Sequence, residues 1–293
     1  IGCVIPAVAI ALMILLNTTV RGRKDIEDNT TIPFLAEIPF KRNKAEEDIV
    51  IVREGGRDGV SEAFRILRTN LEFMVGSENS TKVIMLTSAN PGSGKTFVSF
   101  NLAMTLALAG KKVLLLDVDL RKRSLSKRIH AEGIGLTNYL SGRVNNIDDL
   151  ITKDEFHECL DVIHAGPIPP NPAELLLNNR LDVLVDEIRS RYDYIVIDSV
   201  PSMMVADASI TARVADITIY IIREGLMDRR QLADVERIYR GNTFKNLCIL
   251  LNGVGVKQKR YGYGYGYGYG YGYGEEEQNV EQKRYKKRWW QIF

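Results

Sequence analysis

A phosphate-binding loop is the first feature of this sequence that could carry out chemistry. Residues 89–96 read Ala-Asn-Pro-Gly-Ser-Gly-Lys-Thr and follow the pattern G-x-x-x-x-G-K-[ST], except that alanine replaces the first glycine. In such a loop, backbone N–H groups surround the phosphates, the lysine neutralises the β and γ oxygens, and the threonine hydroxyl binds Mg²⁺. The sequence therefore predicts a site for ATP and Mg²⁺, with nucleotide contacts from Asn90, Pro91, Gly92, Ser93, Gly94, Lys95, Thr96 and Phe97.

Three aspartates follow apolar segments and could complete this site. Asp117 and Asp119 stand two residues apart, so on an extended chain their carboxylates point the same way, and Asp198 ends another apolar segment. Aspartates at such places also cap turns, but beside a phosphate loop three of them favour a metal site at one sheet edge. We expect Thr96, Asp119 and Asp198 to hold Mg²⁺. Lys95, Asp117 and Asp119 would act in catalysis, with Asp117 accepting the proton of the incoming hydroxyl, although Asp117 and Asp119 could exchange roles.

A row of tyrosines near the C-terminus provides candidate phosphate acceptors. Seven tyrosines alternate with glycine: Tyr261, Tyr263, Tyr265, Tyr267, Tyr269, Tyr271 and Tyr273. A strand of this period would have a bare glycine face with nothing to bury, and the glycines make a helix costly. We therefore expect a flexible arm at 257–293, whose basic end at 283–290 would be solvated or would touch a membrane surface. A donor loop and a row of acceptors in one chain suggest a kinase that phosphorylates itself.

The elements that must position these residues follow an α/β pattern. Helical spacing is present at 58–74 and 95–108, and short apolar segments read as strands at 83–87, 113–118, 160–164, 194–198, 217–222 and 247–251. Buried strands that alternate with helices predict a mostly parallel sheet with helices on both faces. This domain would span 58–256, preceded by an extended segment at 32–40.

The N-terminal residues predict a membrane anchor. Residues 1–16 contain no charged side chain, and a membrane-spanning helix needs about 20 such residues. Arg21, Arg23 and Lys24 follow at once, which favours a cytoplasmic position for what comes after. We expect 1–16 to be the C-terminal part of a transmembrane helix and 17–57 a juxtamembrane linker, a buried core helix being the alternative.

Several segments together resemble a known family. They are Ser88–Thr96, Leu116–Arg121, Ile195–Pro201, Pro170–Leu176 and Glu62–Arg68. These segments resemble those of the bacterial tyrosine kinases, which have a P-loop NTPase fold of the deviant, partition-ATPase-like type. One departure is Ser199-Val200-Pro201, where the family usually has a second proline. The resemblance implies the kinase domain of a polysaccharide co-polymerase, placed in the cytoplasm at the bacterial inner membrane, which regulates exopolysaccharide or capsule polymerisation and export.

The resemblance also implies partners. Glu62, Arg65 and Arg68 lie at i, i+3 and i+6 and share a helical face, which alone is most often a solvated face with an internal ion pair. In the family these residues would pair between subunits of a homo-oligomeric ring, for which an octamer is one size, and phosphoryl transfer would occur in trans. Other implied partners are a phosphotyrosine phosphatase, the export machinery and the membrane. Nucleic acid is not expected, since a formal net charge of +2 makes no overall case for it.

Two other functions remain open. A partitioning-type ATPase shares the fold, but such proteins carry a second lysine near the start of the loop, where this chain has Ala89-Asn90-Pro91. The second alternative is a non-catalytic, membrane-anchored scaffold, which would give no function to the set Lys95, Thr96, Asp117 and Asp198.

Overall fold

The computed structural model describes residues 17–40, 49–75, 82–203 and 206–255. The apolar segment at 1–16 and the tyrosine-rich segment at 257–293 lie outside these residues, so the membrane helix and the flexible arm stay predictions. Within the described ranges, no helix has the length and apolar character needed to cross a membrane.

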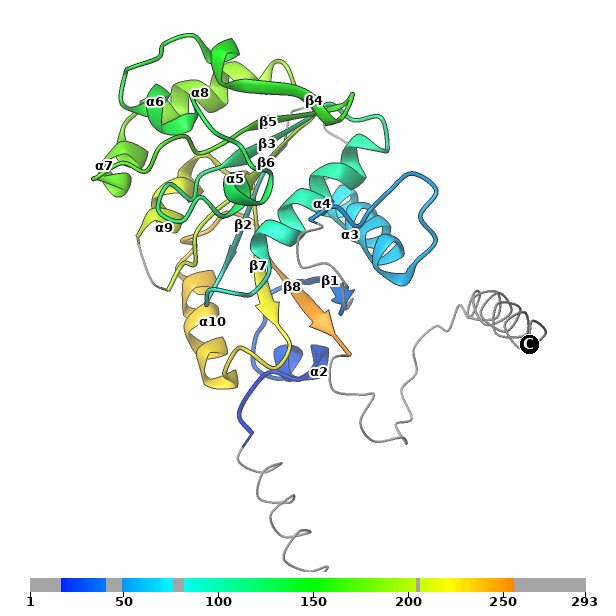
Figure 1. Ribbon diagram of the computed structural model, residues 1–293. Helices are drawn as coiled ribbons and strands as arrows, with labels where there is room; N and C mark the ends of the chain where they lie inside the picture. The colour runs from blue at the N-terminus through cyan, green and yellow to red at the C-terminus, as the bar shows by residue number, and fades with distance from the viewer. Residues whose placement is uncertain (1–16, 41–48, 76–81, 204–205, 256–293) are drawn as a thin grey trace, which may run out of the picture. The chain divides into compact units, whose positions relative to one another are not determined.

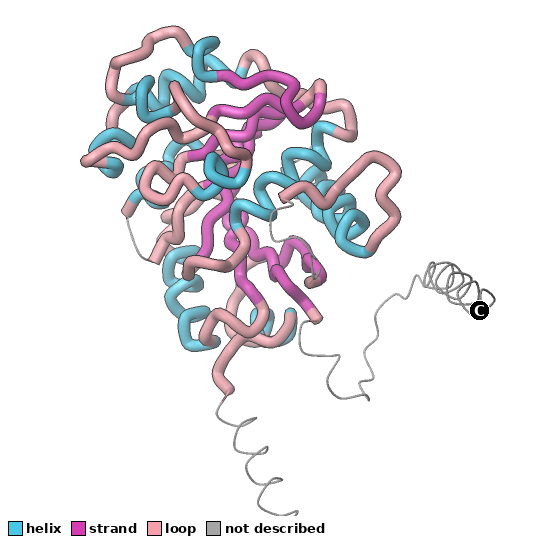
Figure 2. Tube along the Cα trace, viewed as in Figure 1, coloured by secondary structure: helices cyan, strands magenta, loops and turns pink. Residues whose placement is uncertain are grey.

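The described residues contain an eight-stranded sheet in the order β1-β8-β7-β2-β6-β3-β5-β4 (Figure 1, Figure 2). Every neighbouring pair is parallel except β4 with β5, which confirms the predicted, mostly parallel sheet. The strands are β1 Phe34–Pro39, β2 Lys82–Ser88, β3 Val113–Asp117, β4 Ile151–His157, β5 Leu160–Ile163, β6 Tyr194–Asp198, β7 Ile217–Arg223 and β8 Leu247–Val254.

Helices cover both faces of this sheet. The α-helices are α2 Arg23–Glu27, α3 Gly59–Val75, α4 Lys95–Ala107, α5 Ser124–Arg128, α6 Leu136–Leu140, α7 Pro172–Leu177, α8 Arg180–Arg189, α9 Asp207–Thr211 and α10 Leu232–Arg240. Short 3₁₀ turns are η1 Ile147–Leu150, η2 Ala212–Val214 and η3 Arg229–Gln231. Figure 1 shows α3 and α4 on one side of the sheet and α8, α9 and α10 on the other.

Alternation along the strands explains why both faces are buried. In β2, Val83 and Met85 belong to one apolar cluster, whereas Ile84 and Leu86 belong to the other. Helices α8 and α10 contribute to the first cluster, and α3 and α4 to the second. Because each large apolar side chain is worth about 1.5–3 kcal/mol when fully buried, this packing makes the sheet a rigid base for the loops at its edge.

The two edge strands carry the weakest sequence signal. The extended segment at 32–40 contains β1, which pairs in parallel with β8. Strand β4 was not predicted, because its residues are mostly exposed and polar rather than an apolar run. It pairs antiparallel with β5 and closes that edge of the sheet.

Strand order fixes the neighbourhood of the phosphate loop. Strand β2 lies between β6 and β7 and pairs in parallel with both. The loop after β2 is therefore flanked by the carboxyl ends of β6 and β3 on one side and of β7 and β8 on the other. Ligands of open α/β sheets bind at this edge.

Candidate active site

The phosphate loop connects β2 to α4, as the sequence predicts. Gly92 and Gly94 adopt φ angles of 76° and 90°, in the left-handed region that favours glycine. Gly94 is also the N-cap of α4, and a Cβ added there would collide with Nδ2 of Asn252. The loop thus needs glycine at this position both for backbone conformation and for space.

Hydrogen bonds within the loop hold Lys95, which the sequence predicts to be catalytic. The carbonyl oxygen of Asn90 accepts from the hydroxyls of Ser88 and Ser93, each at 2.8 Å. Ser88 Oγ in turn accepts from Lys95 Nζ at 3.1 Å. Burial lowers the pKa of Lys95, while the charges of Asp198 and Asp119 oppose that shift. An anionic phosphate in the loop would favour the charged ammonium further.

Asp198 lies against Thr96 and has one oxygen without a partner. Thr96 Oγ1 donates to Asp198 Oδ2 at 2.7 Å, and Asp198 is buried, with 1% of its surface exposed. Asp198 Oδ1 has no hydrogen-bond partner among the described residues. Burial, followed by the nearby charge of Asp117, raises the pKa of Asp198 to about 7. A buried carboxylate with a vacant oxygen beside a threonine hydroxyl fits the donor set of Mg²⁺.

Asp117 and Asp119 occupy different surroundings, although β3 carries both toward the site. Asp117 is fully buried; its Oδ1 accepts from the backbone N of Asp119 at 3.0 Å, and its Oδ2 accepts from the backbone N and Oγ of Ser126 at 2.9 and 2.6 Å. Burial raises the pKa of Asp117 to about 6. Asp119 follows the end of β3 and accepts from the backbone N of Lys122 and from Ser124 Oγ. Only Asp119 of the pair borders the open cavity described next.

A cavity of about 780 Å³ opens over the phosphate loop. Besides loop residues and Asp119, its lining includes four cations, Lys122, Lys127, Arg128 and Arg223. None of these four forms an ion pair with another described residue, whereas arginines elsewhere do, as Arg121 does with Asp207. A cavity lined by unpaired cations suits an anionic ligand.

Arg223 and Asn252 were not foreseen from the sequence. Asn252 is buried and donates from Nδ2 to the carbonyl oxygen of Ser93 at 2.9 Å. Arg223 and Asn252 stand at or near the carboxyl ends of β7 and β8. The same strand-end rule that selected Asp198 would have selected them, had it been applied to residues other than acids.

The expected interface residues lie on α3 and pair within their own helix. Arg65 Nη1 contacts Glu62 Oε2 at 2.8 Å, and Arg68 Nε lies 3.9 Å from Glu72 Oε1. The other terminal nitrogen of Arg65 donates to the carbonyl oxygen of Gly56. Arg65 thus pairs with Glu62, whereas Arg68 lies near Glu72, and the role of the three residues between subunits stays a prediction.

Comparison with known proteins agrees with this geometry. A family model described as an AAA domain matches residues 81–224. The tyrosine-protein kinase YwqD of Bacillus subtilis is 39% identical over 194 residues, which cover 66% of this chain and 81% of YwqD. The chain belongs to the bacterial tyrosine kinases. It is a protein-tyrosine kinase, which transfers a phosphoryl group to protein tyrosine.

Other members of the tyrosine-kinase family differ in length. A tyrosine-protein kinase of the cps region of Klebsiella pneumoniae is 35% identical over 238 residues, and the match spans 76% of this chain but only 32% of that protein. The solved kinase domain of Escherichia coli tyrosine kinase ETK has a TM-score of 0.72 and 29% identity, covering 85% of this chain and all of that domain. The kinase fold is thus shared, while the longer relatives contain additional sequence.

Proposed function

We propose that this kinase transfers the γ-phosphoryl group of ATP to the tyrosines of its own C-terminal segment. The observation that carries the proposal is the contact of Thr96 with Asp198 beside Lys95, with one Asp198 oxygen left vacant for a cation. The seven tyrosines between Tyr261 and Tyr273 supply acceptors in the same chain.

Mg²⁺ would be held by Thr96 and Asp198, because both oxygens lie where the loop enters α4. Mg²⁺ commonly takes one or two carboxylates and completes its shell with phosphate oxygens and water. When bound, it neutralises charge on the transferring phosphoryl group. Lys95 would leave Ser88 Oγ and bind the phosphates, since the hydroxyl is a weaker partner than an anion.

Asp119 is the better candidate for the carboxylate that receives the tyrosine proton. It borders the cavity, while the side-chain hydrogen bonds of Asp117 within the described residues are with Asp119 and Ser126. Asp117 would then position the start of α5 rather than touch the substrate. This assignment gives Asp119 the role that the sequence first suggested for Asp117, and leaves Thr96 and Asp198 to hold the metal.

Transfer would take place in trans within a ring. A glycine-rich coil of about ten residues, the distance along the chain from Gly255 to Tyr265, spans roughly 17 Å r.m.s., which brings an acceptor within reach of a neighbouring subunit. Glu62, Arg65 and Arg68 on α3 would form the contact between subunits, since arginine forks opposite a carboxylate give a directional interface. Each added phosphate brings about −1.5 to −2 charges, so phosphorylation would loosen the ring until a phosphatase restores it.

The biological setting would be polysaccharide export at the bacterial inner membrane, with the kinase domain in the cytoplasm. Support comes from the relative of the Klebsiella pneumoniae cps region and from Arg21, Arg23 and Lys24 after the apolar residues 1–16. The kinase would then regulate the polymerisation or export machinery through cycles of phosphorylation and ring assembly.

Mixing two variants tests transfer in trans. A full chain with Lys95→Met is incubated with γ-labelled ATP, Mg²⁺ and a chain that ends at residue 256. Label on the Lys95→Met chain supports transfer to the C-terminal segment of another subunit. An unlabelled Lys95→Met chain would favour transfer within one chain. When the unmutated full chain is incubated alone, free phosphate without labelled protein would instead favour a partitioning-type ATPase, and neither product would favour a scaffold.

A further inference from the structure

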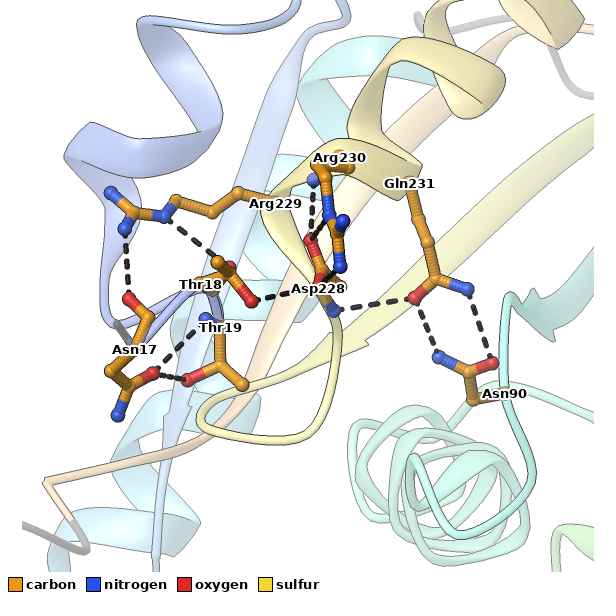
Figure 3. Close-up of polar contacts among 8 residues, drawn as sticks. All are labelled: Asn17, Thr18, Thr19, Asn90, Asp228, Arg229, Arg230 and Gln231. Carbon is orange, nitrogen blue, oxygen red and sulfur yellow. Dashed lines mark hydrogen bonds and ion pairs between the residues drawn. The ribbon is translucent and has the colours of Figure 1, made fainter. Parts of the chain in front are cut away.

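A chain of hydrogen bonds connects residues 17–20, which we call the N-terminal clip, to the phosphate loop (Figure 3). The clip pairs with residues 224–231, the β7–α10 loop. Val20 N donates to Met227 O, and Arg229 N donates to Thr18 O, each at 2.8 Å. An antiparallel bridge between Thr19 and Asp228 lies between these bonds. The two segments are thus fixed together by backbone bonds across more than 200 residues of sequence.

Asp228 links the clip to Gln231, because it hydrogen-bonds both Thr18 and Gln231. Thr18 Oγ1 donates to Asp228 Oδ2 at 2.8 Å, and the backbone and guanidinium of Arg230 donate to the same carboxylate. These hydrogen bonds from Arg230 lower the pKa of Asp228, so it stays ionised. The backbone N of Asp228 donates to Gln231 Oε1 at 3.2 Å and closes a capping box at η3. This box fixes the side-chain orientation of Gln231.

Gln231 faces Asn90 of the phosphate loop, amide against amide (Figure 3). Asn90 Nδ2 donates to Gln231 Oε1 at 3.0 Å, and Gln231 Nε2 approaches Asn90 Oδ1 at 3.5 Å. Neither residue lines the cavity above the loop; both line a separate hollow of about 660 Å³. Gln231 can therefore act on the nucleotide only through Asn90.

Asn90 connects Gln231 to the rest of the phosphate loop. Its carbonyl oxygen accepts from the hydroxyls of Ser88 and Ser93, and Ser88 Oγ accepts from Lys95 Nζ. Leu226 of the same β7–α10 loop lies within 4.0 Å of the place that a Cβ would take on Gly92. The β7–α10 loop thus supports the phosphate loop at its first residues, opposite the acids of β3 and β6.

We propose that Gln231 is a positioning residue for the phosphate loop, and that the N-terminal clip acts on nucleotide binding through Asp228 and Gln231. A loop held in its binding conformation loses less entropy when the nucleotide arrives. Nucleotide affinity then depends on residues that touch no nucleotide and that follow directly on the apolar segment 1–16.

The test measures ADP affinity and unfolding temperature of the full chain. Gln231→Ala should raise the Kd for ADP about 3- to 10-fold, the loss expected for one or two hydrogen bonds. The KM for ATP should rise by the same factor while kcat changes little, because the acids of the site are untouched. Arg237→Ala is the matched control, since this exposed residue of α10 pairs only with Asp234 among described residues, and its Kd should not change.

A double-mutant cycle separates positioning from a general loss of stability. Asn90→Ala combined with Gln231→Ala should bind ADP no more weakly than Asn90→Ala alone, since both changes break the same contact. Thr18→Val should raise Kd about twofold in the parent chain and not at all in the Gln231→Ala chain. Additive effects of the Asn90 and Gln231 changes, or an unchanged Kd in Gln231→Ala, would overturn the positioning role. Additivity of Thr18→Val with Gln231→Ala would overturn the role of the clip. ADP binding needs no tyrosine acceptor, so these results stand apart from autophosphorylation.

Discussion

The phosphate loop has two unlike sides. On the side of β6 and β3 lie carboxylates, of which Asp198 and Asp117 are fully or almost fully buried with raised pKa values. On the side of β7 and β8, the cation Arg223 lines the cavity, but the groups that hold the loop by hydrogen bonds are the neutral amides of Asn252 and Gln231; we call this the neutral side and the other the charged side. The acids of the charged side would bind a cation and accept a proton, whereas the amides of the neutral side hold the backbone of the phosphate loop in place. Substitutions on the first side should therefore change turnover, and those on the second should change affinity.

The largest effect should come from the group that both sides position. Lys95→Met should reduce phosphoryl transfer by on the order of 10³-fold, because one preorganised charge at the transferring group is worth several kcal/mol. Lys111→Met, at an exposed position beyond the C-terminal end of α4, should leave transfer unchanged. Initial rates of tyrosine phosphorylation measure both. Equal rates for the two variants would contradict the assignment of the loop.

Replacing Asp119 or Asp117 by asparagine should have different effects, one on catalysis and the other on stability. Asp119→Asn should lower kcat about 10²- to 10⁴-fold, the range for a general base, with little change in unfolding temperature. Asp117→Asn should cost about 2 kcal/mol of unfolding free energy, because an amide NH₂ would meet the N–H of Ser126. Single-turnover kinetics and denaturant unfolding of both variants decide the point. A catalytic loss in Asp117→Asn larger than that in Asp119→Asn would reverse the roles.

The charged side should also respond to pH in the protein without nucleotide or Mg²⁺. An acid whose folded pKa is raised stabilises the fold at low pH, and that contribution is lost as pH rises through the folded pKa. For Asp198 this window runs from its usual 3.8 to about 7. As pH rises from 5 to 8, the unfolding free energy of Asp198→Asn should therefore increase relative to that of the parent by on the order of 2 kcal/mol. Thermal unfolding across this range checks the sign; a difference that does not vary with pH would contradict it.

On the neutral side, Asn252→Ala should raise the Kd for ADP about 3- to 10-fold through loss of the bond to Ser93. Since amides do not titrate, this factor should be the same at pH 6 and pH 8. Asn179→Ala is a suitable control, because that exposed side chain makes no cap hydrogen bond. Titration of ADP at both pH values measures the effect. A kcat defect at unchanged Kd would mean that the two sides are not divided as described.

The sequence predicted the residues of the charged side but few of those on the neutral side, for a physical reason. The loop and the strand-end acids form local patterns, and in the structure Asp198 contacts Thr96 and its charge acts on Lys95. Gln231 contacts Asn90 across 141 residues, and nothing in its own neighbourhood reveals that partner. Similarly, the central strands follow from continuous apolar runs, whereas the exposed β4 has none. The orientation of the Asp117 side chain could not be predicted from the sequence either. The strand ends at Asp117, so the extended pattern no longer applies, and Ser126 hydrogen-bonds its carboxylate.

Mass spectrometry of the full chain after incubation with ATP and Mg²⁺ tests the central claim most directly, with the Lys95→Met chain treated in parallel. The account predicts phosphate on several tyrosines between Tyr261 and Tyr273 in the parent chain and none in the Lys95→Met chain. A parent chain that consumes ATP yet carries no phosphotyrosine in this segment would contradict it.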